Sequence, residues 1–405
     1  MSTQLFEKIA KDYGTPLYIY FEAQINKQIA ALKLAVAELP CSICYAVKAN
    51  SNLNLLRHFY ERGCGFDIVS EGELRRVIHA CGDTSKVVFS GVGKSPSEIE
   101  FALRSKIKLI NVESAQELSV IAETASNLGV KAPVAFRINP DISVDVHPYI
   151  ATGMRSSKFG LPAEEALALW EGAKRDPALE LIGVDCHIGS QISDVEPLKS
   201  AYSQLIEVAG EFRSRAAPIK VLDFGGGLGV SFSGHYQPLD LQKFSQMLKD
   251  LHNGLDYEII FEPGKFLIAE AGVLLTRVVY TKQNGEHKFV IVDGGMNDLI
   301  RPSLYDAFHH VELIPGGGGT RELDTVDIVG PVCESGCYFA KRRVLPRANP
   351  GDLVAIYDSG AYGFSMASNY NSRPLPAEVL VREDGTVQLI RKRQEAQDMW
   401  REELL

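Results

Sequence analysis

The sequence predicts an α/β protein, namely a closed (β/α)8 TIM-type barrel with a second, β-rich domain. Eight short apolar runs alternate with helical patterns, and polar or glycine-rich residues bound each run, as expected for strands buried on both faces. Eight strands that alternate with helices close into a barrel. Beyond about Lys265 the strands are separated by turns rather than by helices, which indicates a β-rich domain.

The barrel elements follow one another in a regular order. The first strand begins at Ser42, and the later strands are expected at residues 65–69, 86–90, 108–112, 133–137, 181–187, 221–224 and 258–262. Helical patterns include residues 22–38, 70–80, 95–104, 115–128 and 197–213. We therefore place the barrel domain at residues 23–270.

The second domain is predicted from residues 1–22 and 271–405, and a strand at residues 15–20 completes it. Its other strands are expected at residues 271–280, 288–293, 325–329, 352–357, 377–381 and 386–392. The tail at residues 393–405 has a helical pattern. The N-terminal strand would thus join a sheet built from the distant C-terminal part of the chain.

Composition excludes several classes of protein. The net charge of -9 over 405 residues argues against a basic nucleic-acid-binding surface. The sequence shows no secretory signal and no run of about 18 apolar residues, so we expect no membrane span. The 7 cysteines are odd in number and lie mostly in apolar runs, as reduced thiols do. These features predict a cytoplasmic protein without nucleic-acid or membrane partners.

Five residues of chemical interest lie at or near the carboxyl ends of predicted strands. They are Lys48, Asp67, Arg137, His187 and Glu262. The active sites of (β/α)8 barrels gather at that end of the strands. We therefore expect the five side chains to converge on one mouth.

Two glycine-rich motifs are incomplete. Residues 91–95 end like a phosphate-binding P-loop, but Val88 stands where that motif needs its first glycine. Residues 225–230 resemble a dinucleotide fingerprint with Val230 in place of the last glycine. The second motif follows the seventh barrel strand, where such loops often bind phosphate. A tight turn that binds no ligand would account for the same glycines.

A lysine, a histidine, a glutamate and a phosphate loop at one mouth fit pyridoxal phosphate. A desolvated lysine forms a Schiff base with an aldehyde cofactor. Glu262 would keep the pyridine nitrogen protonated by a charge-assisted hydrogen bond, which keeps the ring an electron sink. His187 would lie against the ring face, and Ser190 would add a donor for the phosphate.

Six motifs carry a resemblance to a known family. They are YAVKAN at 45–50, HIGSQ at 187–191, GGG at 225–227, EPG at 262–264, CES at 333–335 and GAY at 360–362. Their order resembles that of the alanine-racemase-fold decarboxylases that use pyridoxal phosphate, over essentially the whole chain. The resemblance implies a head-to-tail homodimer with active sites shared between subunits.

The resemblance also implies residue roles. The residues that would bind the cofactor are Lys48, Asp67, Arg137, His187, Ser190, Gly226, Gly227, Glu262, Gly264, Lys265 and Tyr362. Lys48 would be the Schiff-base lysine, His187 the ring-stacking residue and Cys333 the proton donor from the neighbouring subunit. No metal is implied.

Two positions depart from the family pattern. Lys265 follows Glu-Pro-Gly where arginine is more common, and it loses the planar two-pronged grip on an anion. Cys337 stands where aspartate is common and adds a second thiol near Cys333, which leaves redox sensitivity open. Neither change removes a residue that the chemistry requires.

Within this family the chain resembles the branch whose substrate is meso-diaminopimelate, the precursor of L-lysine. Arg301 would pair with the distal carboxylate of that substrate, with Tyr305 donating a hydrogen bond and Glu334 receiving the distal ammonium. Lys265 and Tyr362 are further substrate candidates. A pocket for ornithine would be expected to have an acid in place of the arginine. Two different classes also stay open, namely a racemase on the same fold and a binding protein derived from a decarboxylase.

Overall fold

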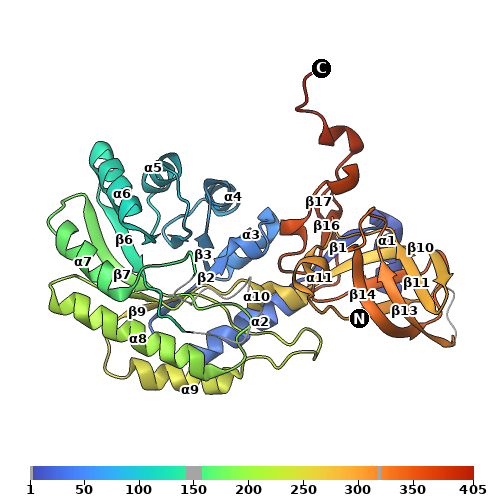
Figure 1. The fold of residues 1–405 in the computed structure, drawn as a ribbon, viewed down its shortest axis with the longest axis horizontal. Coiled ribbons are helices and arrows are strands. Elements are labelled where there is room, and N and C mark those ends of the chain that lie inside the picture. Colours follow the sequence, from blue (N-terminus) through green and yellow to red (C-terminus); the bar gives the residue numbers. More distant parts are fainter. Residues whose placement is uncertain (1–2, 143–156, 317–320) are drawn as a thin grey trace. The chain divides into compact units, whose positions relative to one another are not determined.

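The chain forms two compact units, and the computed structural model describes residues 3–142, 157–316 and 321–405 (Figure 1). One unit comprises Met1–Gln28, Ser231–Tyr236 and Leu267–Leu405, and the other comprises Ile29–Val230 and Gln237–Phe266. Each unit has a hydrophobic core of its own. We refer to them as the β unit and the barrel unit.

The barrel unit contains a closed ring of eight parallel strands. They are β2 (Cys41–Ala46), β3 (Gly65–Ile68), β4 (Val87–Phe89), β5 (Leu109–Val112), β6 (Ala132–Arg137), β7 (Leu179–Asp185), β8 (Val221–Asp223) and β9 (Glu258–Phe261). Strand β9 pairs with β2 and closes the ring. This arrangement confirms the predicted (β/α)8 barrel.

Among the described residues, one helix, α2, precedes the first barrel strand, and seven others separate the successive barrel strands. They are α2 (Glu22–Ala35), α3 (Leu53–Glu61), α4 (Glu71–Cys81), α5 (Pro96–Arg104), α6 (Ala115–Leu128), α7 (Ala163–Ala173), α8 (Val195–Ser214) and α9 (Leu241–His252). The short 3-10 turn η1 (Val47–Ala49) follows β2, and α10 (Lys265–Ile268) and η3 (Ala269–Ala271) follow β9.

Local signals set where these helices begin and end. The hydroxyls of Ser70, Ser95 and Ser114 each accept a hydrogen bond from the backbone N–H three residues later, as N-cap residues do. Helices α4 and α6 end at Gly82 and Gly129, whose φ angles of +72° and +66° suit glycine.

The barrel interior explains why the strands read as unbroken apolar runs. Side chains from six strands form its core cluster, namely Cys44, Val88, Leu109, Ala135, Val221 and Ile260. Helices cover the outer faces, so both faces of each strand exclude water.

The β unit is built around a nine-stranded sheet. Its main path is β14-β13-β11-β10-β1-β16-β17, and β15 pairs with β10 and β12. The strands are β1 (Leu17–Phe21), β10 (Gly272–Asn284), β11 (His287–Val292), β12 (Val311–Ile314), β13 (Leu323–Val329), β14 (Tyr338–Pro346), β15 (Leu353–Ile356), β16 (Ala377–Val381) and β17 (Val387–Arg391). Strand β1 lies between β10 and β16, which confirms that an N-terminal strand completes the C-terminal sheet.

Helix α1 (Thr3–Tyr13) contributes Phe6 and Ile9 to the core of this sheet. The other short helices of the unit are α11 (Arg301–Tyr305), η4 (Phe364–Met366), η5 (Tyr370–Ser372) and η6 (Ala396–Met399). The predicted helical tail was wrong, because residues 393–405 form only η6 and turns. Within the described ranges, no helix combines the length and apolar character needed to cross a membrane.

Candidate active site

Lys48 lies in η1, directly after the first barrel strand, and its amine meets an acid from the next strand. Its Nζ donates to Asp67 Oδ2 at 2.5 Å, and the Asp67 side chain is fully buried whereas that of Lys48 is 38% exposed. The buried carboxylate thus orients a lysine amine that solvent and ligands can still reach.

Arg137 ends β6 and is held by two acids. Its Nη1 donates to Glu113 Oε1 at 2.9 Å, and its Nε lies 3.6 Å from Asp185 Oδ2. Glu113 also accepts hydrogen bonds from the backbone N–H groups of Gly91 and Gly160. These contacts fix the guanidinium at the strand ends, and the charge of the adjacent acids raises the Arg137 pKa despite the opposing effect of burial.

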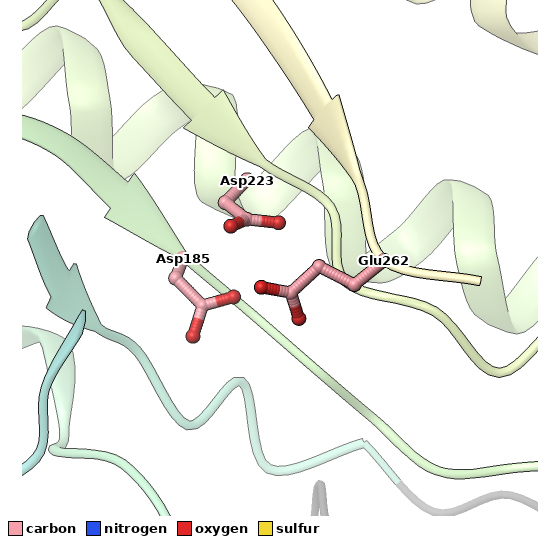
Figure 2. A group of neighbouring side chains, drawn as sticks. All are labelled: Asp185, Asp223 and Glu262. Atoms are coloured by element: carbon pink, nitrogen blue, oxygen red, sulfur yellow. The ribbon is translucent and has the colours of Figure 1, made fainter. Parts of the chain in front are cut away.

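Three buried acids, Asp185, Asp223 and Glu262, come from the ends of β7, β8 and β9. Figure 2 shows their carboxyl groups pointing toward one another, and one ligand oxygen from each lies within 4.8 Å of the others. Burial is the largest cause that raises their pKa values; the charge of Asp223 adds to the shift at Asp185 and Glu262, and that of Asp67 adds to the shift at Asp223. The pKa of Asp223 is raised to about 7, and that of Glu262 is raised well above its ordinary value.

One retained proton would relieve the repulsion among these three carboxylates. In the described part of the chain, Asp223 Oδ2 is buried and has no hydrogen-bond partner. Two carboxyl groups bond only when one of them keeps its proton. The Gly225 N–H, which donates to Asp223 Oδ1 at 3.0 Å, lowers the pKa of Asp223, and proximity to a protonated Glu262 would act in the same direction. Burial of three acids so close together therefore favours retention of a proton within the cluster.

His187 lies two residues beyond β7 and is half-buried. Its Nδ1 accepts a hydrogen bond from the Gly226 N–H at 3.1 Å, so the neutral ring has its proton on Nε2. Burial, followed by the charges of Arg137 and Lys48, lowers the pKa of His187 well below its ordinary value. A neutral aromatic ring is thus held at the mouth.

Glycines bring backbone segments close together around this ring. A Cβ added at Gly226 would lie 2.2 Å from the carbonyl oxygen of Glu262, and one at Gly227 would lie 2.3 Å from that of Gly189. At Gly264 an added Cβ would lie 3.0 Å from the Cβ of Ala46, at the end of β2. The loop after β8 is therefore packed too tightly for a side chain at Gly226 or Gly227, and the loop after β9 leaves little room at Gly264.

The remaining predicted residues of the barrel unit lie on the loops that follow β7 and β9. Ser190 is half-buried, and Lys265 is buried at the start of α10. Lys94, from the incomplete P-loop motif, is used structurally. Its Nζ donates to the carbonyls of Gly91 and Asn111 and to Glu117.

The other predicted residues belong to the β unit. Arg301 is buried at the start of α11, Tyr305 ends the same helix, and Tyr362 has a φ of +56°. Cys333 is exposed, and its backbone N–H donates to Asn371 Oδ1 at 2.9 Å.

Glu334, beside Cys333, accepts a hydrogen bond from the Tyr370 hydroxyl at 3.2 Å. Cys337, which departs from the family pattern, is buried, and its sulfur accepts from the Met296 N–H at 3.3 Å. The structure thus brings one predicted group together at the barrel mouth and carries a second group on the β unit.

Sequence reasoning missed Glu113, Asp185 and Asp223 at the mouth. Each is a single acid within or beside an apolar run, close to a predicted strand end. Their position could have indicated a role, because an acid buried at a strand end needs a hydrogen-bond or ion-pair partner.

Comparison with known proteins shows the family to which this chain belongs. A family model described as "Pyridoxal-dependent decarboxylase, pyridoxal binding domain" matches residues 22–269. A diaminopimelate decarboxylase of Neisseria meningitidis serogroup B is 44% identical over 402 residues, which cover 98% of this chain and 95% of the relative. One from Vibrio cholerae is 46% identical over 392 residues, which cover 97% of this chain and 93% of the relative.

The fold agrees with a solved relative. The crystal structure of diaminopimelate decarboxylase from Helicobacter pylori complexed with L-lysine superposes with a TM-score of 0.94 at 43% identity, and the match covers 98% of this chain and 99% of that chain. Sequence and structure thus agree over nearly the full length. This chain belongs to the pyridoxal-dependent decarboxylases and, among them, to the diaminopimelate decarboxylases.

Proposed function

We propose that this chain catalyses the pyridoxal-phosphate-dependent decarboxylation of meso-diaminopimelate to L-lysine, the last step of lysine biosynthesis. The observation that carries the proposal is the convergence of Lys48, His187 and Glu262 at the barrel mouth. The chain that holds them matches diaminopimelate decarboxylases at 44% and 46% identity over nearly its full length.

The residues at the mouth fit this cofactor. Lys48 offers a partly exposed amine, and the proton-holding cluster beside Glu262 offers an acid for a ring nitrogen. Gly226 and Gly227 lack the side chain that would collide with neighbouring backbone, which suits a phosphate-binding loop. When bound, pyridoxal phosphate supplies an electron sink for the charge left at the substrate carbon when carbon dioxide departs.

Each residue of the mouth has a defined task in this proposal. Lys48 would hold the cofactor covalently, oriented by Asp67, and Glu262 would keep a proton at the ring nitrogen. His187 would pack its neutral ring on the cofactor. Ser190, Gly226, Gly227, Gly264 and Lys265 would bind the phosphate, and Arg137 would support the cofactor and its neighbouring acids.

Residues of the β unit would bind the substrate and return a proton. Arg301 and Tyr305 would hold the distal carboxylate of meso-diaminopimelate, and Glu334 would hold the distal ammonium. Cys333 would donate the proton that replaces carbon dioxide. Tyr362 would contact cofactor or substrate, and Lys265 is the second candidate for a substrate carboxylate.

Three further parts of the proposal concern the whole protein. We keep residues 23–270 as the cofactor-binding domain and residues 1–22 with 271–405 as the β-rich domain, and the family match over residues 22–269 supports this division. We also propose that the chain forms a homodimer whose active sites are shared between the subunits. A cytoplasmic location without nucleic-acid partners stays a prediction from composition.

The direct test is carbon dioxide release from a panel of amino acids by the purified protein. We expect a visible absorbance band from the bound cofactor and turnover of meso-diaminopimelate, with far lower rates for L-ornithine, L-arginine and L-lysine. Preferential turnover of ornithine or lysine would move the chain to another branch of the family. Racemisation without carbon dioxide release would replace the decarboxylase proposal altogether.

A second measurement locates the cofactor. Borohydride reduction and peptide mapping should find the pyridoxyl group on Lys48, and Lys48→Ala should lose the modification. Lys94 is a built-in control, because its amine already donates to three acceptors. Modification of Lys94 or Lys265 in place of Lys48 would contradict the assignment.

A further inference from the structure

The surroundings of Arg301 are unusual for a buried arginine. Its side chain is only 7% exposed at the start of α11, yet among the residues that the structure describes no carboxylate forms an ion pair with it. Its Nη1 instead donates to Nε2 of His309 at 3.0 Å, and its guanidinium carbon lies 5.0 Å from the ring centroid of Phe232.

His309 can hold only one tautomer in this place. Its Nδ1 lies 2.8 Å from the carbonyl oxygen of Tyr357, and a carbonyl only accepts, so Nδ1 carries the proton. Nε2 then has a lone pair, which matches a guanidinium that only donates. The two neighbours of the ring therefore select the same neutral tautomer.

Burial and charge keep His309 neutral. The side chain is fully buried, and desolvation lowers its pKa to about 3, with the charge of Arg301 adding to the effect. The hydrogen bond to Tyr357 opposes this shift and does not overcome it. A protonated ring would point an N–H at the N–H of Arg301. The contact between the two residues is thus a charged donor on a neutral acceptor.

The charged groups around Arg301 leave its positive charge largely uncompensated. Desolvation is the largest influence and lowers its pKa, while Tyr362, Tyr236, Tyr305 and Asp358 act against it. Asp358 accepts a hydrogen bond from Ser233, and burial raises the pKa of Asp358 to about 6.

Arg137 at the barrel mouth shows the opposite arrangement, because Glu113 and Asp185 neutralise it. The acids around Arg137 largely cancel its charge, whereas a neutral acceptor leaves the charge of Arg301 available to a ligand.

We propose that His309 is a specificity-determining positioning residue that orients Arg301 through a neutral acceptor and so reserves its charge for the distal carboxylate of the substrate. The inference rests on the proposed function, in which Arg301 binds that carboxylate. A histidine suits the task because it accepts a strong hydrogen bond without adding negative charge. An acid at position 309 would fix Arg301 equally well but would cancel its charge.

Two small ligands separate charge recognition from general binding. Decarboxylation removes the carboxylate at the reacting carbon, so the product L-lysine keeps the distal one. 1,5-Diaminopentane has the same carbon chain and both amines but no carboxylate. Inhibition constants for this pair isolate the contact with Arg301, and they do not depend on the rate of turnover of either compound.

The experiment compares His309→Glu and His309→Gln in the full-length enzyme with cofactor bound. In His309→Glu we expect the KM for meso-diaminopimelate and the inhibition constant of L-lysine to rise at least about tenfold, the effect of losing a charge-assisted hydrogen bond. The inhibition constant of 1,5-diaminopentane should change less than about threefold. His309→Gln, whose amide oxygen still accepts, should fall between wild type and His309→Glu.

Two controls make the result specific. His310→Gln alters the exposed neighbour and should leave all three constants unchanged. In an Arg301→Ala background, His309→Gln should add little, because residues that act through one contact are not additive. Additive effects, or equal losses for L-lysine and 1,5-diaminopentane, would show that His309 is merely structural and would overturn the proposal.

The failure of the underlying assignment has a different signature. If Arg301→Ala leaves the constants for meso-diaminopimelate and L-lysine unchanged, Arg301 does not bind the distal carboxylate, and the proposed substrate site fails together with this inference. If Arg301→Ala raises both constants while His309→Glu does not, the substrate site stands and the role of His309 is refuted.

Discussion

Single side chains at the barrel mouth are set by their neighbours more than by their own chemistry. Asp67 and Glu262 are both buried acids at strand ends, yet only Asp67 bonds directly to Lys48. Glu262 faces Asp185 and Asp223 instead, and burial beside other acids raises its pKa (Figure 2). One acid therefore orients an amine, and in the proposed function the other would keep a proton at the ring nitrogen of the cofactor.

The raised pKa of Asp223 predicts how stability depends on pH. In the folded chain Asp223 keeps its proton up to about pH 7, whereas an unfolded aspartate loses it near pH 3.9, about the ordinary value. Between these values the folded state binds more protons, so the free energy of unfolding falls as pH rises. Asp223→Asn removes this dependence and should stabilise the protein more at pH 8 than at pH 5, by at least about 1 kcal/mol.

Urea unfolding at the two pH values, with cofactor in excess, measures this difference. The asparagine oxygen can still accept from the Gly225 N–H, so the local turn is preserved. Asp194→Asn, at the exposed start of α8, is the matched control because asparagine caps a helix as well as aspartate does. If wild type and Asp223→Asn respond alike to pH, Asp223 does not hold the proton.

At the residue scale, the sequence predicts functional residues that lie at strand ends. It misses residues whose role depends on a contact with a side chain distant in the sequence. Lys48, His187 and Glu262 follow from the rule that chemistry gathers at the carboxyl ends of barrel strands. His309 does not lie at the end of a barrel strand. Its importance comes from the contacts with Arg301 and Tyr357, and the Tyr357 contact joins residues 48 positions apart.

Among elements, the loop after β8 leaves little room for side chains at its glycines. The Gly226 N–H donates to His187, and the Glu262 N–H donates to the carbonyl of Gly225 at 2.7 Å. This loop therefore connects the imidazole ring and the end of β9 through backbone atoms, and a shift in the loop moves both.

Replacing Gly226 by alanine should disturb this connection. The added Cβ would lie 2.2 Å from the Glu262 carbonyl oxygen, so backbone must move. We expect Gly226→Ala to weaken pyridoxal phosphate binding at least about tenfold, measured by absorbance titration, because both Glu262 and the phosphate loop shift. Gly172→Ala in α7 is the control, since a Cβ there meets nothing within 4 Å. Equal affinities for the two variants would show that the loop adapts.

The elements that were predicted have clearer sequence patterns than the elements that were missed. Helix α6 and strand β16 have the predicted bounds, because the first has capping residues and the second is apolar except for Glu378. Strand β14 was missed, since Lys341, Arg342 and Arg343 interrupt its alternation and Arg342 has a φ of +50°. The irregular register of β13 and β14 reflects tertiary pairing that local sequence does not encode.

At the scale of the whole molecule, the candidate residues are divided between the two units. The barrel unit holds Lys48 and Glu262, and the β unit holds Arg301, Cys333 and Glu334. Each unit has its own core, so a substitution in one set need not unfold the other. An exposed cysteine on one unit and a cofactor site on the other are consistent with the proposed exchange of residues between subunits.

That exchange is testable by mixing two inactive proteins. Lys48→Ala removes the cofactor lysine, and Cys333→Ala removes the proposed proton donor, so each homodimer should be inactive or nearly so. If each site uses Cys333 from the neighbouring subunit, a mixed dimer contains one site with both residues and one with neither. Random reassortment forms mixed dimers in about half of the population, each with one of two sites intact, which predicts about a quarter of wild-type activity.

The same mixture distinguishes the opposite architecture. If Lys48 and Cys333 of one chain serve the same site, every site in every dimer lacks one of them, and mixing restores nothing. Mass spectrometry of the mixture verifies that mixed dimers form. A Lys48→Ala and Lys48→Arg mixture is the matched negative control, because no pairing of these chains supplies a competent lysine. Recovery only in the Lys48→Ala and Cys333→Ala mixture would place Cys333 of one subunit at the cofactor of the other.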